Sequence, residues 1–506
     1  MKTLLKILAV ILVLSAAGVG AALYLLKDPN RFKPRIEALI RDTSGYEVDL
    51  AGDLAWQLWP PVVLKGTDIR FSDDSTDYAL AAFGVRANLL PLVTGGELEI
   101  TQLRLDDLVM TDREFDGVTR VDRLRLDNFS IGEPSPLRVE ATLVGADGVD
   151  SKVTIEGPLT YFSDADRLTI KPMAFDYDGI RGSCDVAASE LSREPIFTSR
   201  PTADDLLPLD TVRAIDWEVS CTIPELATES QTLRNLAVTS ANAGARMANR
   251  IEVPDAFGGR VTTTVDIDSR KRPPVWTVDT DANDIQSQAL MDVLAPSLTW
   301  AAPLLAGGKL TLTGNTMDAL VESASGRIAL QSTAGRIDIG AIKDAVLGLA
   351  QLAGKGEEVA RWQRELAYTT LDGSWTVDGT DQDIQFSIDN LELKAMGLLN
   401  ALSGAMDLRA TVTVEDNPEL DVLKVSEELY GLPIPLRCRG TLDVPDCGLD
   451  SEAAQQTLAD YASGRLKGEA SEKLDELLQE KVPEEYQESA KELLKGLFGG
   501  SREERD

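Results

Sequence analysis

Residues 406–414 read MDLRATVTV, and in this stretch an apolar side chain alternates with a polar one. Successive side chains of a β-strand point to opposite faces of the sheet, so the stretch predicts a strand with one apolar and one wet face. The same pattern recurs at 261–267, 310–312 and 384–388, separated by Gly, Asp, Asn and Pro clusters that are typical of turns. We therefore predict a mainly β body built from many antiparallel strands.

Helical patterns interrupt this body at a few places. Residues 35–41 (RIEALIR) and 287–294 have the apolar spacing of short helices, and a longer helix is predicted from about Ala341 to Leu366. The segment 451–506 is rich in Ala, Glu, Lys and Leu, and predicts amphipathic helices split at Pro483. Their apolar stripes either cap the open end of the sheet or contact a membrane or a partner protein.

The composition argues against several classes of function. The chain has 506 residues, a formal net charge of -33 and no histidine. The negative charge disfavours nucleic acid as a partner, because phosphate groups are repelled. The absence of histidine excludes serine–histidine and cysteine–histidine hydrolases, zinc proteases and most transition-metal sites. We expect no catalytic residues, no metal site and no cofactor; the enzymatic alternative is a glycan-cleaving enzyme that uses two carboxylates.

The four cysteines are Cys184, Cys221, Cys438 and Cys447, and none has the C-x-x-C spacing of a zinc or redox site. The turn-forming residues 444–446 lie between the last two. We predict two structural disulfides, Cys184–Cys221 and Cys438–Cys447, in an oxidising compartment. Four buried free thiols are the alternative.

Near the N-terminus, an uncharged apolar stretch runs from Ile7 to Leu26. Its length matches the roughly 20 residues that an α-helix needs to cross a bilayer. A cleaved signal peptide is the alternative, because Lys2 and Lys6 form a positive start and small residues follow. The long apolar run favours a retained transmembrane helix, while the charges on its two sides leave its orientation open.

Shortly after this stretch, residues 50–61 read LAGDLAWQLWPP. Alternation places Leu54, Trp56 and Leu58 on one face of a short strand. The following prolines cannot donate to a ladder, so the strand is predicted to be an edge or first strand.

Residues 25–74 resemble the opening of the AsmA family. The matching features are an apolar span, the step Asp28-Pro29-Asn30, a short helix with Arg35, the glycine Gly45, and a strand that begins Gly52-Asp53-Leu54 and ends at an aromatic residue and Pro60. Further fragments that resemble the family lie at 85–112, 281–296, 307–314, 335–346, 366–414 and 432–450. The resemblance covers roughly residues 1 to 450, and the order of the fragments makes it specific.

The resemblance implies a single-pass inner-membrane protein of Gram-negative bacteria with its body in the periplasm. The family is tied to outer-membrane biogenesis and to phospholipid transport, and is related to TamB and to chorein-type lipid-transfer proteins. The implied fold is an N-terminal transmembrane helix, an elongated and curled antiparallel β-sheet that forms an apolar groove, and C-terminal amphipathic helices. The expected partners are phospholipid, the inner membrane and, through the C-terminal helices, outer-membrane or envelope proteins.

Five regions are expected from these patterns together. They are a cytoplasmic start and transmembrane helix (1–27), an AsmA-like, chorein-like N-terminal region (28–130), a central β region (131–300), an AsmA-like C-terminal β region (301–450) and an acidic helical tail (451–506). The candidate groove-lining residues are Leu54, Trp56, Leu58, Ile384, Phe386, Ile388, Met406, Leu408, Val412 and Val414. The alternative for these residues is an ordinary sandwich core, which would indicate a non-catalytic envelope scaffold.

Overall fold

The structure is a computed structural model. It describes residues 28–34, 37–38, 47–57, 62–72, 76–88, 99–112, 118–144, 149–191, 204–228, 231–296, 298–352, 356–417, 419–420 and 422–457. The predicted span from Ile7 to Leu26, Leu58, most of the predicted helix 35–41 and nearly all of the tail lie outside these residues. No helix within the described residues has the length and apolar character required to cross a membrane.

The chain forms two compact units. Unit 1 comprises Met1–Val293, Pro303–Leu330 and Thr376–Gly379, and unit 2 comprises Leu294–Ala302, Gln331–Trp375 and Thr380–Asp506. Antiparallel strands dominate the described residues of both units, which confirms the prediction of a mainly β body.

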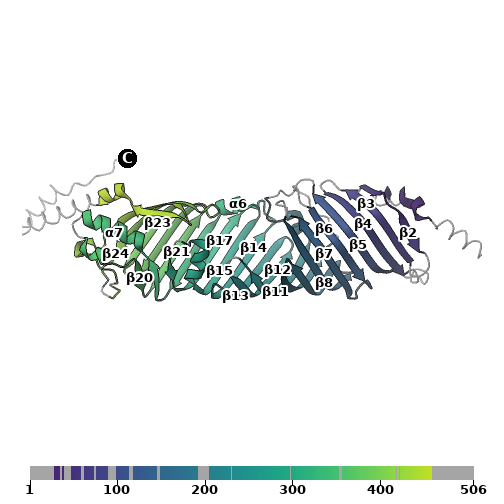
Figure 1. Cartoon of the computed structure of the whole chain (residues 1–506), viewed down its shortest axis with the longest axis horizontal. Coiled ribbons are helices and arrows are strands. Elements are labelled where there is room, and N and C mark those ends of the chain that lie inside the picture. Colours follow the sequence, from purple (N-terminus) through teal and green to yellow (C-terminus); the bar gives the residue numbers. More distant parts are fainter. Residues whose placement is uncertain are drawn as a thin grey trace, which may run out of the picture. The chain divides into compact units, whose positions relative to one another are not determined.

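Unit 1 contains an antiparallel sheet in which most strands pair with their neighbours in sequence, and β3 to β8 lie side by side (Figure 1). The strands are β1 (Glu47–Leu50), β2 (Leu54–Gln57), β3 (Val62–Ser72), β4 (Thr76–Asn88), β5 (Glu99–Asp112), β6 (Val118–Asp127), β7 (Ser135–Val144), β8 (Asp150–Phe162), β9 (Arg167–Tyr177), β10 (Ile180–Ser189), β11 (Asp216–Ala227), β12 (Thr232–Ala243), β13 (Arg246–Ala256), β14 (Gly259–Asp268), β15 (Val275–Gln286), β17 (Pro303–Thr313) and β18 (Ser325–Ser332). The helices are η1 (Pro29–Phe32), α4 (Leu209–Ala214), α5 (Ser287–Leu294) and α6 (Met317–Glu322). Helix α5 confirms the prediction for 287–294.

The edge of this sheet is built from two short strands in succession. Both β1 and β2 pair with β3, and among the described elements β2 contacts chiefly β3 and η1, as expected for the predicted edge strand. Gly52 separates them, and its N–H donates to the carbonyl of Asp68 at 3.1 Å. A Cβ atom at Gly52 would lie 2.1 Å from the carbonyl oxygen of Thr67, so only glycine permits this close approach.

Unit 2 contains further antiparallel strands, several short helices and a small three-stranded sheet. The strands are β21 (Leu371–Asp378), β22 (Asp381–Ile388), β23 (Leu391–Leu399), β24 (Ala405–Val414), β25 (Ile434–Thr441) and β26 (Pro445–Leu449). The small sheet consists of β16 (Trp300–Ala301), β19 (Gly335–Asp338) and β20 (Glu365–Tyr368), and the helices are α7 (Gly340–Leu352), α8 (Glu357–Ala360) and η2 (Glu427–Leu429). Helix α7 packs against β25 and β26.

The prediction of one helix from about Ala341 to Leu366 is wrong beyond Leu352. Helix α7 ends at Leu352, α8 is a separate single turn, and Leu366 lies in strand β20. Gly354 and Gly356 stand between the two helices, and glycine is among the weakest helix formers. In β20 the side chains of Leu366 and Tyr368 are only 6% and 2% exposed. The apolar residues of this stretch are therefore buried core residues of a strand and do not form the face of a helix.

Candidate functional site: an apolar sheet face

A row of apolar side chains crosses five neighbouring strands of unit 1. Leu105 of β5 lies opposite Leu124 of β6, Leu124 opposite Val139 of β7, Val139 opposite Ile155 of β8, and Ile155 opposite Phe175 of β9. Directly opposed residues of an antiparallel pair share a face of the sheet, so these five side chains form one continuous row. All five are half-buried.

Two further rows run beside this one on the same face. They consist of Leu103, Leu126 and Leu137, and of Leu108, Val121, Ala141 and Val153. Together the three rows make an apolar surface across β5 to β9, which we call the apolar face of unit 1.

The degree of burial shows how this face differs from a closed core. The side chains in the middle of a two-layer sandwich are screened by a second sheet about 10 Å away and are fully buried. On the apolar face from β5 to β8, every described side chain is half-buried or exposed except Ser135, which is 0% exposed. Much of this apolar surface is therefore incompletely covered by the described residues.

The opposite face of the same strands carries a network of ion pairs. Arg123 lies 3.8 Å from Asp106 and 3.6 Å from Glu140, and Arg138 lies 2.9 Å from both Glu140 and Glu156. Exposed ion pairs of this kind contribute little stability individually. Their consequence here is that one face of β5 to β8 is charged while the other is apolar.

The apolar face is filled by the protein's own side chains where it meets the edge strands. Leu50, Leu54, Ile69 and Leu80 are between 5% and 8% exposed and form a core cluster, against which Leu105 and Leu108 pack. The predicted groove residue Leu54 is thus part of a closed core. The backbone of Trp56 pairs with Leu64, while its side chain lies outside the described part of the chain.

The residues that precede the edge strands form hydrogen bonds to the backbone beside this cluster. Asp28 accepts hydrogen bonds from the backbone and side-chain nitrogens of Asn30, both at 3.0 Å. Asn30 in turn bonds the backbone N–H and carbonyl of Leu54, and Lys33 Nζ donates to the carbonyl of Gly52 at 2.6 Å. The step Asp28-Pro29-Asn30 therefore positions the start of the chain against the edge of the sheet.

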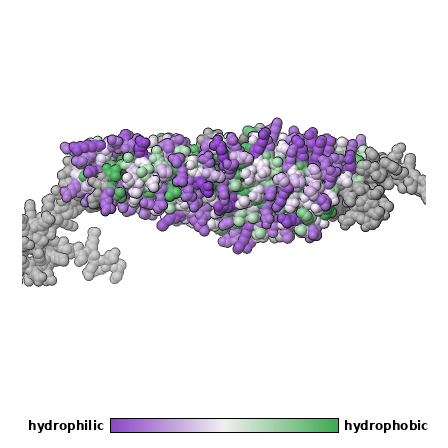
Figure 2. Space-filling model, turned by 90° about the horizontal axis from the view of Figure 1, so that it is seen from below, coloured by the Kyte–Doolittle hydropathy of each residue, from purple (hydrophilic) through white to green (hydrophobic). Residues whose placement is uncertain are grey.

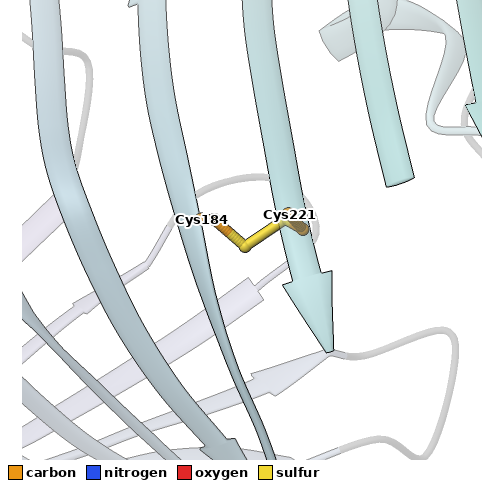
Figure 3. Close-up of a disulfide and its surroundings, with 2 residues drawn as sticks. All are labelled: Cys184 and Cys221. Carbon is orange, nitrogen blue, oxygen red and sulfur yellow. A yellow bond between two sulfur atoms is a disulfide. The ribbon is translucent and has the colours of Figure 1, made fainter. Parts of the chain in front are cut away.

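Cys184 of β10 and Cys221 of β11 lie directly opposite each other and are joined by a disulfide with a Cα–Cα distance of 4.0 Å (Figure 3). Cys438 of β25 and Cys447 of β26 are joined in the same way, at 4.1 Å. Each bridge links two neighbouring strands.

The predicted groove residues of unit 2 share one face of its sheet. Phe386 of β22, Leu393 of β23, Val412 of β24 and Ile434 of β25 are directly opposed in turn. Burial divides the predicted set into two groups. Ile388, Val412 and Val414 are 6%, 0% and 0% exposed, whereas Ile384, Phe386, Met406 and Leu408 are half-buried.

The groups with shifted pKa values belong to ion pairs on the polar faces. A bidentate hydrogen bond from Arg437, at 2.9 and 2.8 Å, lowers the pKa of Asp407 below its usual range. The corresponding bond from Arg270 lowers the pKa of Asp268 to about 2. The described residues contain no group of three or more acidic, cysteine or histidine side chains suited to a metal ion.

A shallow hollow of about 620 Å³ lies over β9 to β14 of unit 1, and its lining includes Lys171, Asp185, Glu218, Arg250 and Asp266. Charged side chains and hydroxyl groups predominate in it, so it does not suit an apolar ligand. The face drawn in Figure 2 likewise shows mainly hydrophilic residues, with hydrophobic ones scattered among them.

Sequence reasoning missed the half-buried residues of β6 to β8 as candidates. A register shift between Val121 and Arg123 interrupts the alternation of β6, so Val121 and Leu124 share a face although they are three positions apart. The simple period of two fails at such a bulge. The alternation of Leu124 with Leu126, read by itself, would have found this strand.

Comparison with known proteins finds similarity in the N-terminal part of the chain. The model of the AsmA family matches residues 1–112. Protein AsmA of Escherichia coli (strain K12) is 31% identical over 113 residues, which are 22% of this chain and 18% of AsmA. The match thus spans less than a fifth of that relative, and no solved structure matches. The N-terminal residues of this chain are thus similar to the AsmA family.

Proposed function

We propose that this protein is anchored in the inner membrane, has its body in the periplasm and serves outer-membrane biogenesis. It binds phospholipid acyl chains on its apolar sheet faces and conducts the lipid between the inner and outer membranes. The similarity of residues 1–112 to the AsmA family supports the role in the cell envelope. The observation that carries the lipid-binding part is the half-buried row formed by Leu105, Leu124, Val139, Ile155 and Phe175.

The physical basis of the proposal is the partition of acyl chains between water and an apolar protein surface. Soluble proteins rarely leave a large contiguous apolar patch uncovered unless a ligand or partner fills it. Each CH₂ group of an acyl chain that leaves water for such a surface gains about 0.8 kcal/mol. The rows of unit 1 therefore lower the barrier to removing a lipid from its bilayer, while the headgroup stays in water. No bond is made or broken.

Native mass spectrometry of the full chain after gentle extraction tests this proposal. We expect phospholipid to accompany the protein. A chain that is reproducibly free of lipid, while remaining folded by circular dichroism, would overturn the proposal.

A non-catalytic scaffold for envelope assembly is the second candidate. The closed part of the unit 2 face favours it, because Val412 and Val414 are 0% exposed and already packed by the protein itself. A scaffold would retain its activity in cells when lipid binding is abolished in unit 1, so a variant of that kind separates the two candidates.

A further inference from the structure

Two neighbouring strands of unit 2 are joined by an unusually long connection. Val412 of β24 lies opposite Ile434 of β25, yet the chain between the two strands runs through residues 415–433. Two residues suffice to join antiparallel neighbours, and connections beyond about 12–15 residues commonly have a function of their own. We call residues 415–433 the stop segment, of which the structure describes all but 418 and 421.

The stop segment is held in place by specific hydrogen bonds. Asn390 is 2% exposed, and its side chain donates to the carbonyl of Leu423 at 2.8 Å and accepts from the N–H of Leu423 at 3.1 Å. The indole N–H of Trp362 donates to the carbonyl of Lys424 at 2.8 Å. Gly431 donates to the carbonyl of Val414 at 2.9 Å, which ties the segment to the end of β24.

The segment also supplies apolar side chains to the core. Leu423, Val425, Leu429 and Leu432 are between 2% and 9% exposed. Leucine and valine at this depth are packed side chains, so this part of the connection is a component of the core of unit 2.

Burial changes along the apolar face of a single strand. On β24, Val414 and Val412 are 0% exposed and Ala410 is 7% exposed. Leu408 and Met406, on the same face but farther from the stop segment, are half-buried. On β24, therefore, the fully buried residues lie at the end of the strand from which the stop segment departs, whereas on β23 Leu391, Ala395 and Leu399 are all buried, at 0%, 6% and 6% exposed.

We propose that the stop segment ends the lipid-binding face within unit 2. Acyl chains contact Phe386, Met406 and Leu408, and are excluded from Val412 and Val414. An acyl chain that reached Val412 would have to displace packed apolar side chains and break the hydrogen bonds of Asn390. It would replace one apolar contact by another, so no free energy of apolar burial would be gained. This inference rests on the proposed function and specifies which part of the unit 2 face takes the lipid.

Site-specific photocrosslinking in the full chain, in cells, tests the proposal. Single p-benzoylphenylalanine substitutions are placed at Phe386, Leu408 and Val412, with Ile155 of unit 1 as the reference position. We expect phospholipid adducts at Ile155, Phe386 and Leu408, and a yield at least tenfold lower at Val412.

The outcomes separate the two levels of the argument. Equal adduct yields at Val412 and Leu408 would overturn the inference, as would adducts at Ile155 without any at Phe386 and Leu408. The absence of adducts at every position, Ile155 included, would overturn the proposed function itself.

Because a large side chain at Val412 can disturb folding, hydrogen exchange on the unsubstituted chain provides an independent measurement. The probe is palmitoyl-oleoyl phosphatidylethanolamine, added to delipidated protein. We expect slower exchange in peptides that contain 381–386 and 405–409, and no change in 422–432. Protection of the stop segment by lipid would overturn the inference.

Loosening the segment provides a further test. Asn390→Ala is expected to raise the adduct yield at Val412 severalfold, because the contacts to Leu423 are lost. The matched control is Asn400→Ala, since within the described part of the chain the side chain of Asn400 accepts from the N–H groups of Leu402 and Ser403 in its own turn. An equal rise in both variants would contradict the proposal.

Discussion

Asn30 and Leu54 are joined by two hydrogen bonds. The side-chain oxygen of Asn30 accepts from the N–H of Leu54 at 2.9 Å, and its side-chain nitrogen donates to the carbonyl of Leu54 at 3.1 Å. The asparagine amide thus acts as one further rung of the ladder at the edge strand β2. In this way Asn30, which lies four positions after the predicted span ends at Leu26, satisfies both backbone groups of Leu54 in the edge strand.

Asn30→Ala should therefore lower the free energy of unfolding of unit 1 by about 1–3 kcal/mol, because two partly buried backbone groups lose their partner. Chemical denaturation and hydrogen exchange of β2 measure this effect. The matched control is Arg31→Ala, since Arg31 is exposed and, among the described residues, forms a 3.9 Å ion pair with Asp28. Equal losses in the two variants would refute the assigned role of Asn30.

Leu124→Glu should reduce phospholipid occupancy about tenfold or more, because a carboxylate on the apolar face is costly to bury beside an acyl chain. Val109→Glu is the control. Val109 is also half-buried, but it lies opposite Arg120, one position from Leu108 and thus on the other face of the sheet. Native mass spectrometry of both variants gives the occupancy. Loss of lipid in both, or in neither, would contradict the assignment of the faces.

The two disulfides should stabilise the chain to different extents. The bridge between Cys184 and Cys221 closes a separation of 37 residues, whereas that between Cys438 and Cys447 closes one of 9. Loop-closure entropy predicts a loss of about 4 kcal/mol for the double Cys→Ser variant of the first pair and about 3 kcal/mol for the second. Denaturant titration measures both, and a larger loss for the shorter loop would show that chain entropy is not the main term.

Asp268 should make unit 1 sensitive to acid. Its pKa is about 2 in the folded protein because of the hydrogen bond from Arg270, against an ordinary value of 3.8. A lowered folded-state pKa contributes stability that is complete above the ordinary value and is lost as the pH falls through the folded value.

The difference in Tm between the unsubstituted chain and Asp268→Asn should therefore be largest above about pH 4, fall to a small fraction near pH 2 and vanish below it. Thermal unfolding followed by circular dichroism at a series of pH values measures it. Asp266→Asn changes an exposed carboxylate of the same strand and should lower Tm less at neutral pH. A difference for Asp268→Asn that persists unchanged at pH 2 would exclude the ion pair as its cause.

The predictions from sequence succeeded where the local pattern is regular and failed where distant residues intervene. The alternation of Met406 to Val414 located strand β24 (Ala405–Val414) to within one residue. The helix expected to extend to Leu366 stopped at Leu352, because strand pairing in a small sheet outcompeted a weak helical pattern beyond the glycines. The bulge at Val121 concealed the apolar row of β6, since its effect depends on pairing with β7.

The sequence by itself determined that the body consists of amphipathic antiparallel strands, because the alternation of side chains is a local property of the extended backbone. It also contained the Asp28-Pro29-Asn30 and Gly52-Asp53-Leu54 steps that resemble the AsmA family. Only the tertiary structure decided which apolar residues are sealed and which are half-buried. Val412 and Leu408 share a strand, a face and an apolar character, yet Val412 is 0% exposed and Leu408 is half-buried. Burial depends on what packs above a side chain, and that is set by chain segments far from it in sequence.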